Sequence, residues 1–515
     1  MSFELIQLRL GFANNSSSSH SLVVLPAPAS DIGISHDSPI GDYGWEAFTL
    51  TDNEVKQDYL AQQIYQQISK SVGEEASVEY IKNILGVDVH ALDSQGIDHQ
   101  SAFLLPVEAD GKTPHQEFIK SFSKWLSQEH VIILGGNDND GEHPLSSQYD
   151  NFQLPYTPYD GGVPLIADFD EVYQVWTLFS KETGAKMRIR FNEGPPLPEH
   201  HANLPSSRPS LVDVKITDKC PFQCSYCYQA SLPTGRHAPL SEIAHIASEL
   251  GKSRVFEVAL GGGEPTLHPD FIDILKVFRQ HNVIPNFTTR NLAWLKNKNK
   301  AQEIYNLMGS FAVSVDSFEE VEKTWEIWEK FLKENNITTT WGEKPKLSFQ
   351  VVVGAVPWAE IEKILNWTQT DKLVWNGPAI TLLGYKDVGF GEQWRSEKPE
   401  VLQDQVKWVS RVQKLIKDHK YRNLKIRIDT ALAESALDEL TKIKITNKVF
   451  HTIEGSTSMY IDAVKKTMAP SSYARSDKFV PFDKNWLQNY QDFTSEMPLD
   501  SLNAKAPHGK SPQLG

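Results

Sequence analysis

Three cysteines, Cys220, Cys224 and Cys227, carry the clearest chemical capacity in this 515-residue chain, which has no other cysteine. They lie in "KCPFQCSYC", with three residues between the first two and two residues between the last two. Three thiols in so short a window predict a shared site, and two kinds of centre use such a set. Zinc takes three thiolates and a histidine, here His237 or His268, as a closed structural site. An iron–sulfur cube takes three thiolates on three irons and leaves its fourth iron open to another ligand.

Strand-like and helix-like segments alternate around and after these cysteines. Strand-like apolar segments lie at 212–218, 255–260, 283–289, 311–317, 346–356 and 379–385. Amphipathic segments follow them, as at 240–250, where Ile243, Ile246, Ala247 and Leu250 share one helical face. About six such units predict a parallel sheet covered by helices, either doubly wound or closed toward a barrel. Active residues of such folds lie at the carboxyl ends of the strands, where the cysteines also lie.

Composition shifts divide the chain into segments. Residues 192–210 are rich in proline, serine and histidine and predict a linker. Before this linker, residues 1–191 predict an N-terminal α/β domain of unknown role. After it, residues 211–430 hold the repeated units, 431–498 predict a short α/β extension, and 499–515 predict a disordered tail.

The N-terminal region carries few chemical signals. Its apolar patterns predict strands at 130–136 and 185–191 and a helix at 172–184. The stretch "GFANNSSSSHSLVV" at 11–24 resembles the N-terminal region of uncharacterised bacterial and phage proteins that carry a similar serine run. A polar turn, a modified acceptor, an embedded leader-like element and a phosphate-binding loop are alternative interpretations of the serines, and the resemblance implies no activity.

The cysteine spacing C-x3-C-x2-C, with Tyr226 before the last cysteine, resembles the cluster motif of the radical S-adenosylmethionine (radical SAM) superfamily. After the second strand, "GGGEP" resembles that superfamily's SAM-binding motif, here Gly261, Gly262, Gly263, Glu264 and Pro265. The resemblance implies a partial (β/α)6 barrel and a [4Fe-4S] cluster held by Cys220, Cys224 and Cys227. Glycines in the motif would let backbone groups approach the methionine part of SAM, and Glu264 would face its ammonium group.

Polar residues at two further strand ends fit the same resemblance. Thr288 and Asn291 lie at the end of the third strand, and Ser314 and Asp316 at the end of the fourth. In this family such positions hydrogen-bond the ribose or carboxylate of SAM, although turn formers and helix caps have the same residue types. After the sixth strand, "LLGYKDVGFG" is expected to contact adenine through Leu382 and Leu383 and substrate through Tyr385.

The resemblance also implies a mechanism. The open iron would bind SAM, an electron donor such as flavodoxin or ferredoxin would supply one electron, and a 5′-deoxyadenosyl radical would take hydrogen from a substrate. The cofactors would carry the hard chemistry, and the protein would position them and exclude water.

The C-terminal stretch "FHTIEGSTSMYIDAVKKTMAPSSYA" resembles the auxiliary-cluster (SPASM or twitch) segment of radical SAM peptide maturases. Serines Ser456, Ser458 and Ser471 lie where such segments have cysteines, so a second cluster is not expected. The remnant favours a peptide or protein substrate. The alternatives are the same chemistry on a small metabolite or nucleotide, and a non-catalytic zinc or iron–sulfur protein.

The overall composition indicates which classes of binding partner and which cellular compartment to expect. The 66 acidic against 51 basic residues give a net charge of −15, which argues against general binding of nucleic acid. The sequence has neither a signal-peptide pattern at its start nor an apolar run of about 20 residues, the length a membrane helix needs. These features predict a cytoplasmic protein that does not bind membranes, in a compartment that keeps the thiols reduced.

Overall fold

The structure is a computed structural model that describes residues 4–9, 21–25, 27–35, 43, 48–86, 105–108, 113–135, 151–152, 165–181, 184–191, 204–337, 346–373, 377–398, 401–419, 425–436, 439 and 453–495. It divides into two compact units, Met1–Pro195 and Pro196–Gly515. The serine run and the predicted tail at 499–515 lie outside the described residues, as does much of the predicted linker. No described helix is long and apolar enough to span a membrane.

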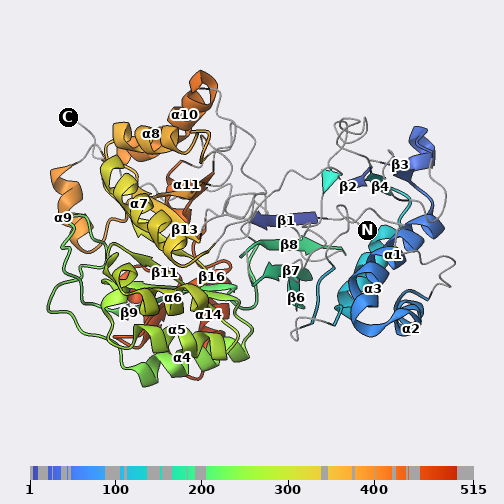
Figure 1. Ribbon diagram of the computed structural model, residues 1–515, viewed down its shortest axis with the longest axis horizontal. Coiled ribbons are helices and arrows are strands. Elements are labelled where there is room, and N and C mark those ends of the chain that lie inside the picture. The colour runs from blue at the N-terminus through green and yellow to red at the C-terminus, as the bar shows by residue number, and fades with distance from the viewer. Residues whose placement is uncertain are drawn as a thin grey trace. The chain divides into compact units, whose positions relative to one another are not determined.

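The N-terminal unit contains two small antiparallel sheets and three helices in its described part (Figure 1). One sheet has the order β1 (Glu4–Arg9), β8 (Lys186–Arg190), β7 (Val175–Ser180), β6 (Leu165–Asp170). The other has the order β3 (Phe48–Leu50), β4 (Val131–Gly135), β2 (Ser21–Val24), β5 (Asn151–Phe152). The helices are α1 (Asn53–Val72), α2 (Glu74–Leu85) and α3 (Gln116–Leu126). Residues of α1, α3 and both sheets share one apolar core.

One prediction for this unit is wrong. The predicted helix at 172–184 is instead β7, which pairs with β6 and β8, followed by a turn in which Gly184 has a φ of 68°. The segment "VWTLFS" is rich in β-branched and aromatic residues, and all six of its residues are buried. A strand buried on both faces shows no alternation, so its apolar run cannot be distinguished from a buried helix by periodicity.

The C-terminal unit is built on a ten-stranded sheet whose first seven strands in chain order are parallel. These strands are β9 (Leu211–Thr217), β10 (Glu257–Gly262), β11 (Ile284–Thr289), β12 (Phe311–Ser314), β13 (Leu347–Val352), β14 (Ala379–Leu383) and β15 (Ile426–Ile428). The helices that follow them are α4 (Leu240–Lys252), α5 (Phe271–Gln280), α6 (Lys298–Leu307), α7 (Phe318–Glu334), α8 (Trp358–Trp367), α9 (Phe390–Glu397), α10 (Val401–His419) and α11 (Thr430–Ser435). This strand-helix repeat is the predicted partial barrel.

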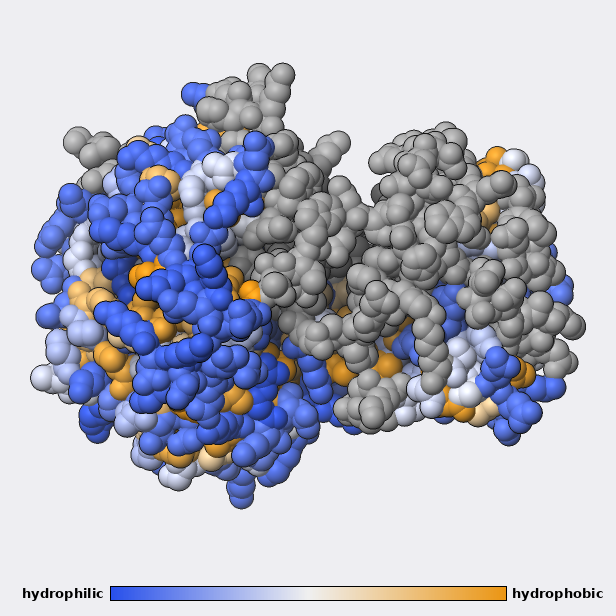
Figure 2. All heavy atoms as spheres, in the orientation of Figure 1, coloured by the Kyte–Doolittle hydropathy of each residue, from blue (hydrophilic) through white to orange (hydrophobic). Residues whose placement is uncertain are grey.

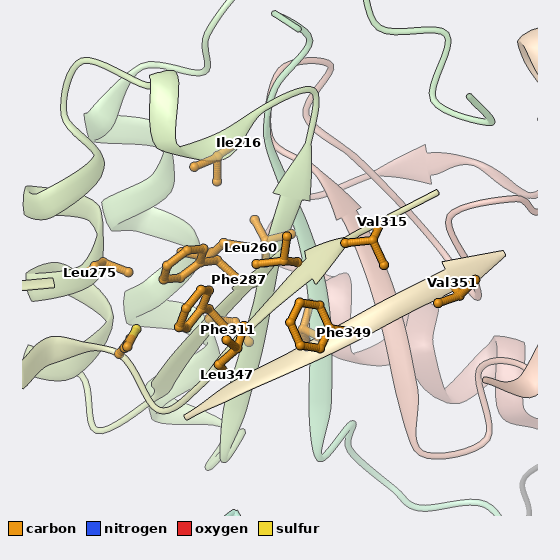
Figure 3. Packing of buried hydrophobic residues seen from close by; sticks show 14 of the residues in the cluster. Ile216, Leu260, Leu275, Phe287, Phe311, Val315, Leu347, Phe349 and Val351 are labelled. Atoms are coloured by element: carbon orange, nitrogen blue, oxygen red, sulfur yellow. The ribbon is translucent and has the colours of Figure 1, made fainter. Parts of the chain in front are cut away.

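Alternate side chains of these strands pack against the helices. Phe287 of β11, Phe311 of β12 and Phe349 of β13 lie together with Leu260 and Leu275 in the buried cluster (Figure 3). The rings of Phe287 and Phe311 stack with centroids 5.5 Å apart. Burial of each such side chain contributes about 1.5–3 kcal/mol. The helices turn hydrophilic residues outward over much of this unit on the face in Figure 2. The strands' remaining side chains therefore face the inside of the partial barrel.

The C-terminal extension joins this sheet. Strand β16 (Ser458–Asp462) pairs parallel with β9, and β17 (Thr467–Ala469) and β18 (Val480–Pro481) continue antiparallel from it. Helix α14 (Trp486–Ser495) follows. The extension thus continues the barrel sheet beyond its first strand.

Candidate active site

The cysteine loop, residues 218–236, leaves the carboxyl end of β9. Its ends are held together because Cys220 N–H donates to Leu232 O at 2.9 Å and Asp218 N–H donates to Arg236 O at 2.8 Å. Within the loop, Cys227 N–H donates to Cys224 O at 3.1 Å. All three cysteines are partly exposed and none forms a disulfide. The loop therefore presents three available thiols on a closed backbone frame.

The glycine motif is bonded directly to the base of this loop. Gly263 N–H donates to Thr217 O at 2.7 Å, and Glu264 N–H donates to Lys219 O at 2.8 Å. A Cβ on Gly262, which has a φ of +116°, would lie 2.3 Å from Thr217 O, and one on Gly263 would lie 2.2 Å from Lys219 O. Only glycine permits so close an approach of two backbones. The two motifs that the sequence singled out thus form one unit.

Gly261 differs from the other two glycines. A Cβ built on it would meet no atom within 4 Å. Open space at the end of a strand that pairs with the strand leading into the cysteine loop fits a ligand that contacts backbone. The residues present therefore fit a [4Fe-4S] cluster on the cysteines and SAM beside Gly261.

Glu264 is engaged with its own chain. Its carboxylate accepts hydrogen bonds from Thr266 N–H at 3.2 Å, Thr266 Oγ1 at 2.6 Å, Thr289 Oγ1 at 2.6 Å and Arg290 N–H at 2.9 Å. The residue is 2% exposed. Glu264 therefore ties the glycine motif, which continues through Pro265 into a 3-10 turn, to the end of β11. Thr289 and Arg290, which make this tie, were not among the predicted site residues.

The polar residues predicted at the ends of β11 and β12 lie in two groups. Asn291 Nδ2 donates to Thr266 Oγ1 at 3.0 Å, so it belongs to the Glu264 network. Thr288 and Ser314 are partly buried residues of β11 and β12, and each lies next to a fully buried core position. Their alternation with core residues places both on the inner side of the sheet.

Tyr226 and Asp316 are brought together, as part of a group that includes Arg290. The Tyr226 hydroxyl donates to Asp316 Oδ1, and Arg290 Nη2 lies 2.6 Å from Asp316 Oδ2. Burial raises the pKa of Cys224, and the guanidinium of Arg290 opposes that rise. Arg290 is thus a cation beside the thiols that the sequence analysis missed. Its place in "TTRN" at a strand end was the available signal.

The segment after β14 packs against the cysteine loop. Phe390 N–H donates to Cys227 O at 3.0 Å, and a Cβ on Gly389 would lie 2.4 Å from Tyr228 O. The ring of Trp394 meets Tyr226 edge-on at 5.8 Å. The expectation that Leu382 contacts adenine is wrong, because its side chain is fully buried in the core between sheet and helices.

Ionisable side chains gather around Lys386, just after β14. The Lys386 ammonium lies 4.7 Å from the ring centroid of Tyr228 and 4.9 Å from that of Tyr473, and 3.8 Å from Asp429 Oδ2. Tyr473 OH donates to Glu454 Oε1 at 2.8 Å. Three distant segments, including the C-terminal extension, therefore meet beside Cys227.

Glu454 supplies a stability prediction. Burial raises its pKa from 4.5 to about 7, against the opposing effects of Lys386 and the Tyr473 hydrogen bond. Since the folded state then binds more protons than the unfolded state between these values, stability falls as pH rises from about 4.5 to 7. Glu454→Gln should raise the free energy of unfolding at pH 8 by up to about 3 kcal/mol and leave it unchanged at pH 4.

Denaturant unfolding of both proteins at pH 4, 6 and 8 would measure this difference. Glu303→Gln, on the outer surface of α6, is the matched control and should follow the wild-type pH dependence. If the free energies of unfolding of Glu454→Gln and wild type differ by the same amount at pH 4, 6 and 8, the raised pKa of Glu454 is contradicted.

One of the two histidines considered as a zinc ligand has no ring nitrogen available for a metal. His268 Nε2 bonds Ala238 O at 2.9 Å, and its Nδ1 accepts from Asp270 N–H at 3.1 Å, so both ring nitrogens are engaged. His237 Nδ1 lies 2.9 Å from Thr217 Oγ1. In the part of the chain that the structure describes, no three His, Cys, Asp or Glu side chains converge on a single metal position.

Known proteins are similar to parts of this chain. Residues 214–366 match the family profile of the Radical SAM superfamily. GTP 3′,8-cyclase of Haemophilus influenzae (strain PittGG) is 32% identical over 110 residues, which are 21% of this chain and 33% of that protein. The enzyme of the same name from Pectobacterium atrosepticum is 32% identical over 111 residues, 21% of this chain and 34% of its own. The chain thus matches about one third of the length of these curated relatives.

Solved structures show more distant likeness. Streptococcus suis SuiB bound to the precursor peptide SuiA is 16% identical with a TM-score of 0.42, covering 57% of this chain and 70% of that one. Native anSMEcpe with bound AdoMet is 12% identical with a TM-score of 0.38, covering 57% and 82%. The profile match, the parallel strand-helix repeat and the paired motifs lead to one conclusion: the chain carries a radical SAM enzyme domain, whose cofactors are a [4Fe-4S] cluster and SAM.

Proposed function

We propose that this protein reductively cleaves SAM at a single [4Fe-4S] cluster held by Cys220, Cys224 and Cys227. One observation carries the proposal: the loop that presents these thiols is hydrogen-bonded to a glycine motif whose Gly261 borders open space. When bound, the cluster and SAM supply a 5′-deoxyadenosyl radical that takes a hydrogen atom from the substrate.

The chain's own residues hold and orient these groups. Gly261, Gly262 and Gly263 bring backbone close to the methionine part of SAM. Glu264 fixes that backbone through its four accepted hydrogen bonds. Tyr226 and Asp316, with Thr288, Asn291 and Ser314, are proposed to line the remainder of the SAM site. Preorganised contacts of this kind lower the entropic cost of reaction.

The proposed substrate is a peptide or protein. The resemblance of the C-terminal segment to peptide maturases supports this class. In that segment Tyr460 OH donates to Gln229 Oε1 of the cysteine loop at 3.4 Å, and Tyr473 lies near Lys386, which also lies near Tyr228 of the loop. A small nucleotide is the second candidate, because the curated relatives are named GTP 3′,8-cyclases. A flavodoxin- or ferredoxin-like donor would deliver the electron, in a reducing cytoplasm that preserves the thiols.

The test is anaerobic reconstitution of the full-length protein with iron and sulfide, followed by SAM and dithionite. We expect 5′-deoxyadenosine, detected by mass spectrometry, only when SAM and reductant are both present. Full iron and sulfide loading with no 5′-deoxyadenosine would overturn the proposed activity. Zinc binding without iron uptake would instead favour the non-catalytic alternative.

A further inference from the structure

Within the described part of the chain, one side chain on the inner face of β9 makes no hydrogen bond or ion pair. Val212, Val214 and Ile216 alternate along the strand and are buried against the helices, so Asp213, Lys215 and Thr217 face the inside of the partial barrel. Lys215 pairs with Asp218 and lies 3.7 Å from Asp462.

Thr217 Oγ1 lies 2.9 Å from His237 Nδ1. Asp213 is exposed, and its carboxylate makes no hydrogen bond or ion pair with any residue that the structure describes.

The exposure of Asp213 shows that the inside of the barrel is open at this point. Asp213 is flanked by Ala259 of β10 and Tyr460 of β16, so neither edge of the strand is free, and helices cover its other face. Desolvation by the surrounding protein raises its pKa to about 6, and the charge of Lys386 opposes that rise. The inner side of β9 and β10 around Asp213, where this side chain is accessible to solvent, is here called the inner hollow.

The inner hollow extends toward the proposed SAM site. Gly261, which borders open space, lies two residues beyond Ala259 along β10 and opposite Lys215. Two residues of strand span about 7 Å. A group bound at Asp213 would thus lie deeper in the barrel than SAM and on the same inner face.

The charges around the inner hollow favour a positively charged ligand. Lys386 has the largest electrostatic effect at Asp213, and the negative charges of Asp429 and Glu257 act against it. The Lys386 ammonium already lies 3.8 Å from Asp429 Oδ2, and 4.7 and 4.9 Å from the ring centroids of Tyr228 and Tyr473. A phosphate group would therefore be repelled by the Asp213 carboxylate, whereas an ammonium or guanidinium group would form an ion pair with it.

We propose that Asp213 binds a cationic group of the substrate in the inner hollow, so that the substrate presents a lysine or arginine side chain and not a nucleoside triphosphate. This inference rests on the proposed function and names its substrate class. Asp213 then acts as the residue that determines specificity, and the hydrogen atom removed lies on or near the bound side chain.

Calorimetry on the reconstituted full-length protein with SAM and without reductant tests the proposal. The probes are N-acetyl-lysine N-methylamide, N-acetyl-arginine N-methylamide, N-acetyl-norleucine N-methylamide and GTP. We expect the lysine and arginine probes to bind more tightly than the uncharged norleucine probe and than GTP. Asp213→Asn should weaken the binding of the lysine and arginine probes by about tenfold or more and leave the affinity for the norleucine probe unchanged.

Asp273→Asn, on the outer helix α5, is the matched control and should bind like wild type. A melting temperature of Asp213→Asn at or above that of wild type would show that the variant is folded.

Equal affinity for lysine and norleucine, tighter binding of GTP, no binding of either cationic probe, or an unchanged Asp213→Asn would each overturn the inference. Such a result in protein that still forms 5′-deoxyadenosine would leave the proposed function standing. If the wild-type protein takes up no iron and forms no 5′-deoxyadenosine, the proposed function itself is overturned.

Discussion

Cys224→Ala is expected to lose the visible iron–sulfur absorbance and all measurable formation of 5′-deoxyadenosine. In the proposed cluster each thiolate would hold one iron of the cube, and the chain has no further cysteine to replace a missing one. Cys224 is partly exposed on a loop and outside the apolar core, so the variant should fold like wild type. Iron and sulfide analysis, absorbance and electron paramagnetic resonance after anaerobic reconstitution would measure the loss.

The adjacent Ser225→Ala is the control for this change. Ser225 is exposed on the same loop and offers no thiol, so this variant should load iron and cleave SAM as wild type does. A Cys224→Ala protein with full cluster content and unchanged SAM cleavage would show that the cysteines do not hold the cluster. A variant with a lowered melting temperature would point to a structural role for the thiol instead.

The barrel was predictable because its signals are local. Each strand of residues 211–383 is a short apolar run followed by an amphipathic helix, and such repeats have few alternative arrangements. The cysteine and glycine motifs were predictable for the same reason, since each is contiguous in sequence. Their hydrogen-bonded contact then follows from two neighbouring parallel strands whose carboxyl ends lie at one edge.

Residues that depend on long-range register were not predictable. Asp213 and Lys386 are separated by more than 170 positions in sequence, and only closure of the sheet brings them within electrostatic reach. Pairing of β16 with β9, which places Tyr460 beside Asp213, carries no local signature either. The same limit explains Leu382: its neighbours in sequence could not show which side of β14 faces the helices.

Gly263→Ala is expected to weaken the binding of both cofactors, because the new Cβ would lie 2.2 Å from the backbone oxygen of Lys219. A backbone oxygen cannot rotate away as the end of a flexible side chain can. The backbone at Lys219, which leads into Cys220, must therefore move. Forced overpacking of this kind costs about 1–3 kcal/mol. We expect reduced iron content after reconstitution and SAM binding weaker by about tenfold or more, since 1.4 kcal/mol corresponds to a factor of ten.

Gly261→Ala, two residues earlier, is the matched comparison. The two variants together distinguish an effect on the structure of the cysteine loop from an effect on SAM binding. Its Cβ would enter space that holds no protein atom within 4 Å, so the cysteine loop and iron loading should be unaffected. If SAM occupies that space, its affinity should nevertheless fall, as calorimetry on the loaded protein would show. Unchanged SAM affinity in Gly261→Ala would move SAM away from Gly261. Unchanged iron loading in Gly263→Ala would show that the cysteine loop tolerates displacement at Lys219, and the two motifs would then act independently.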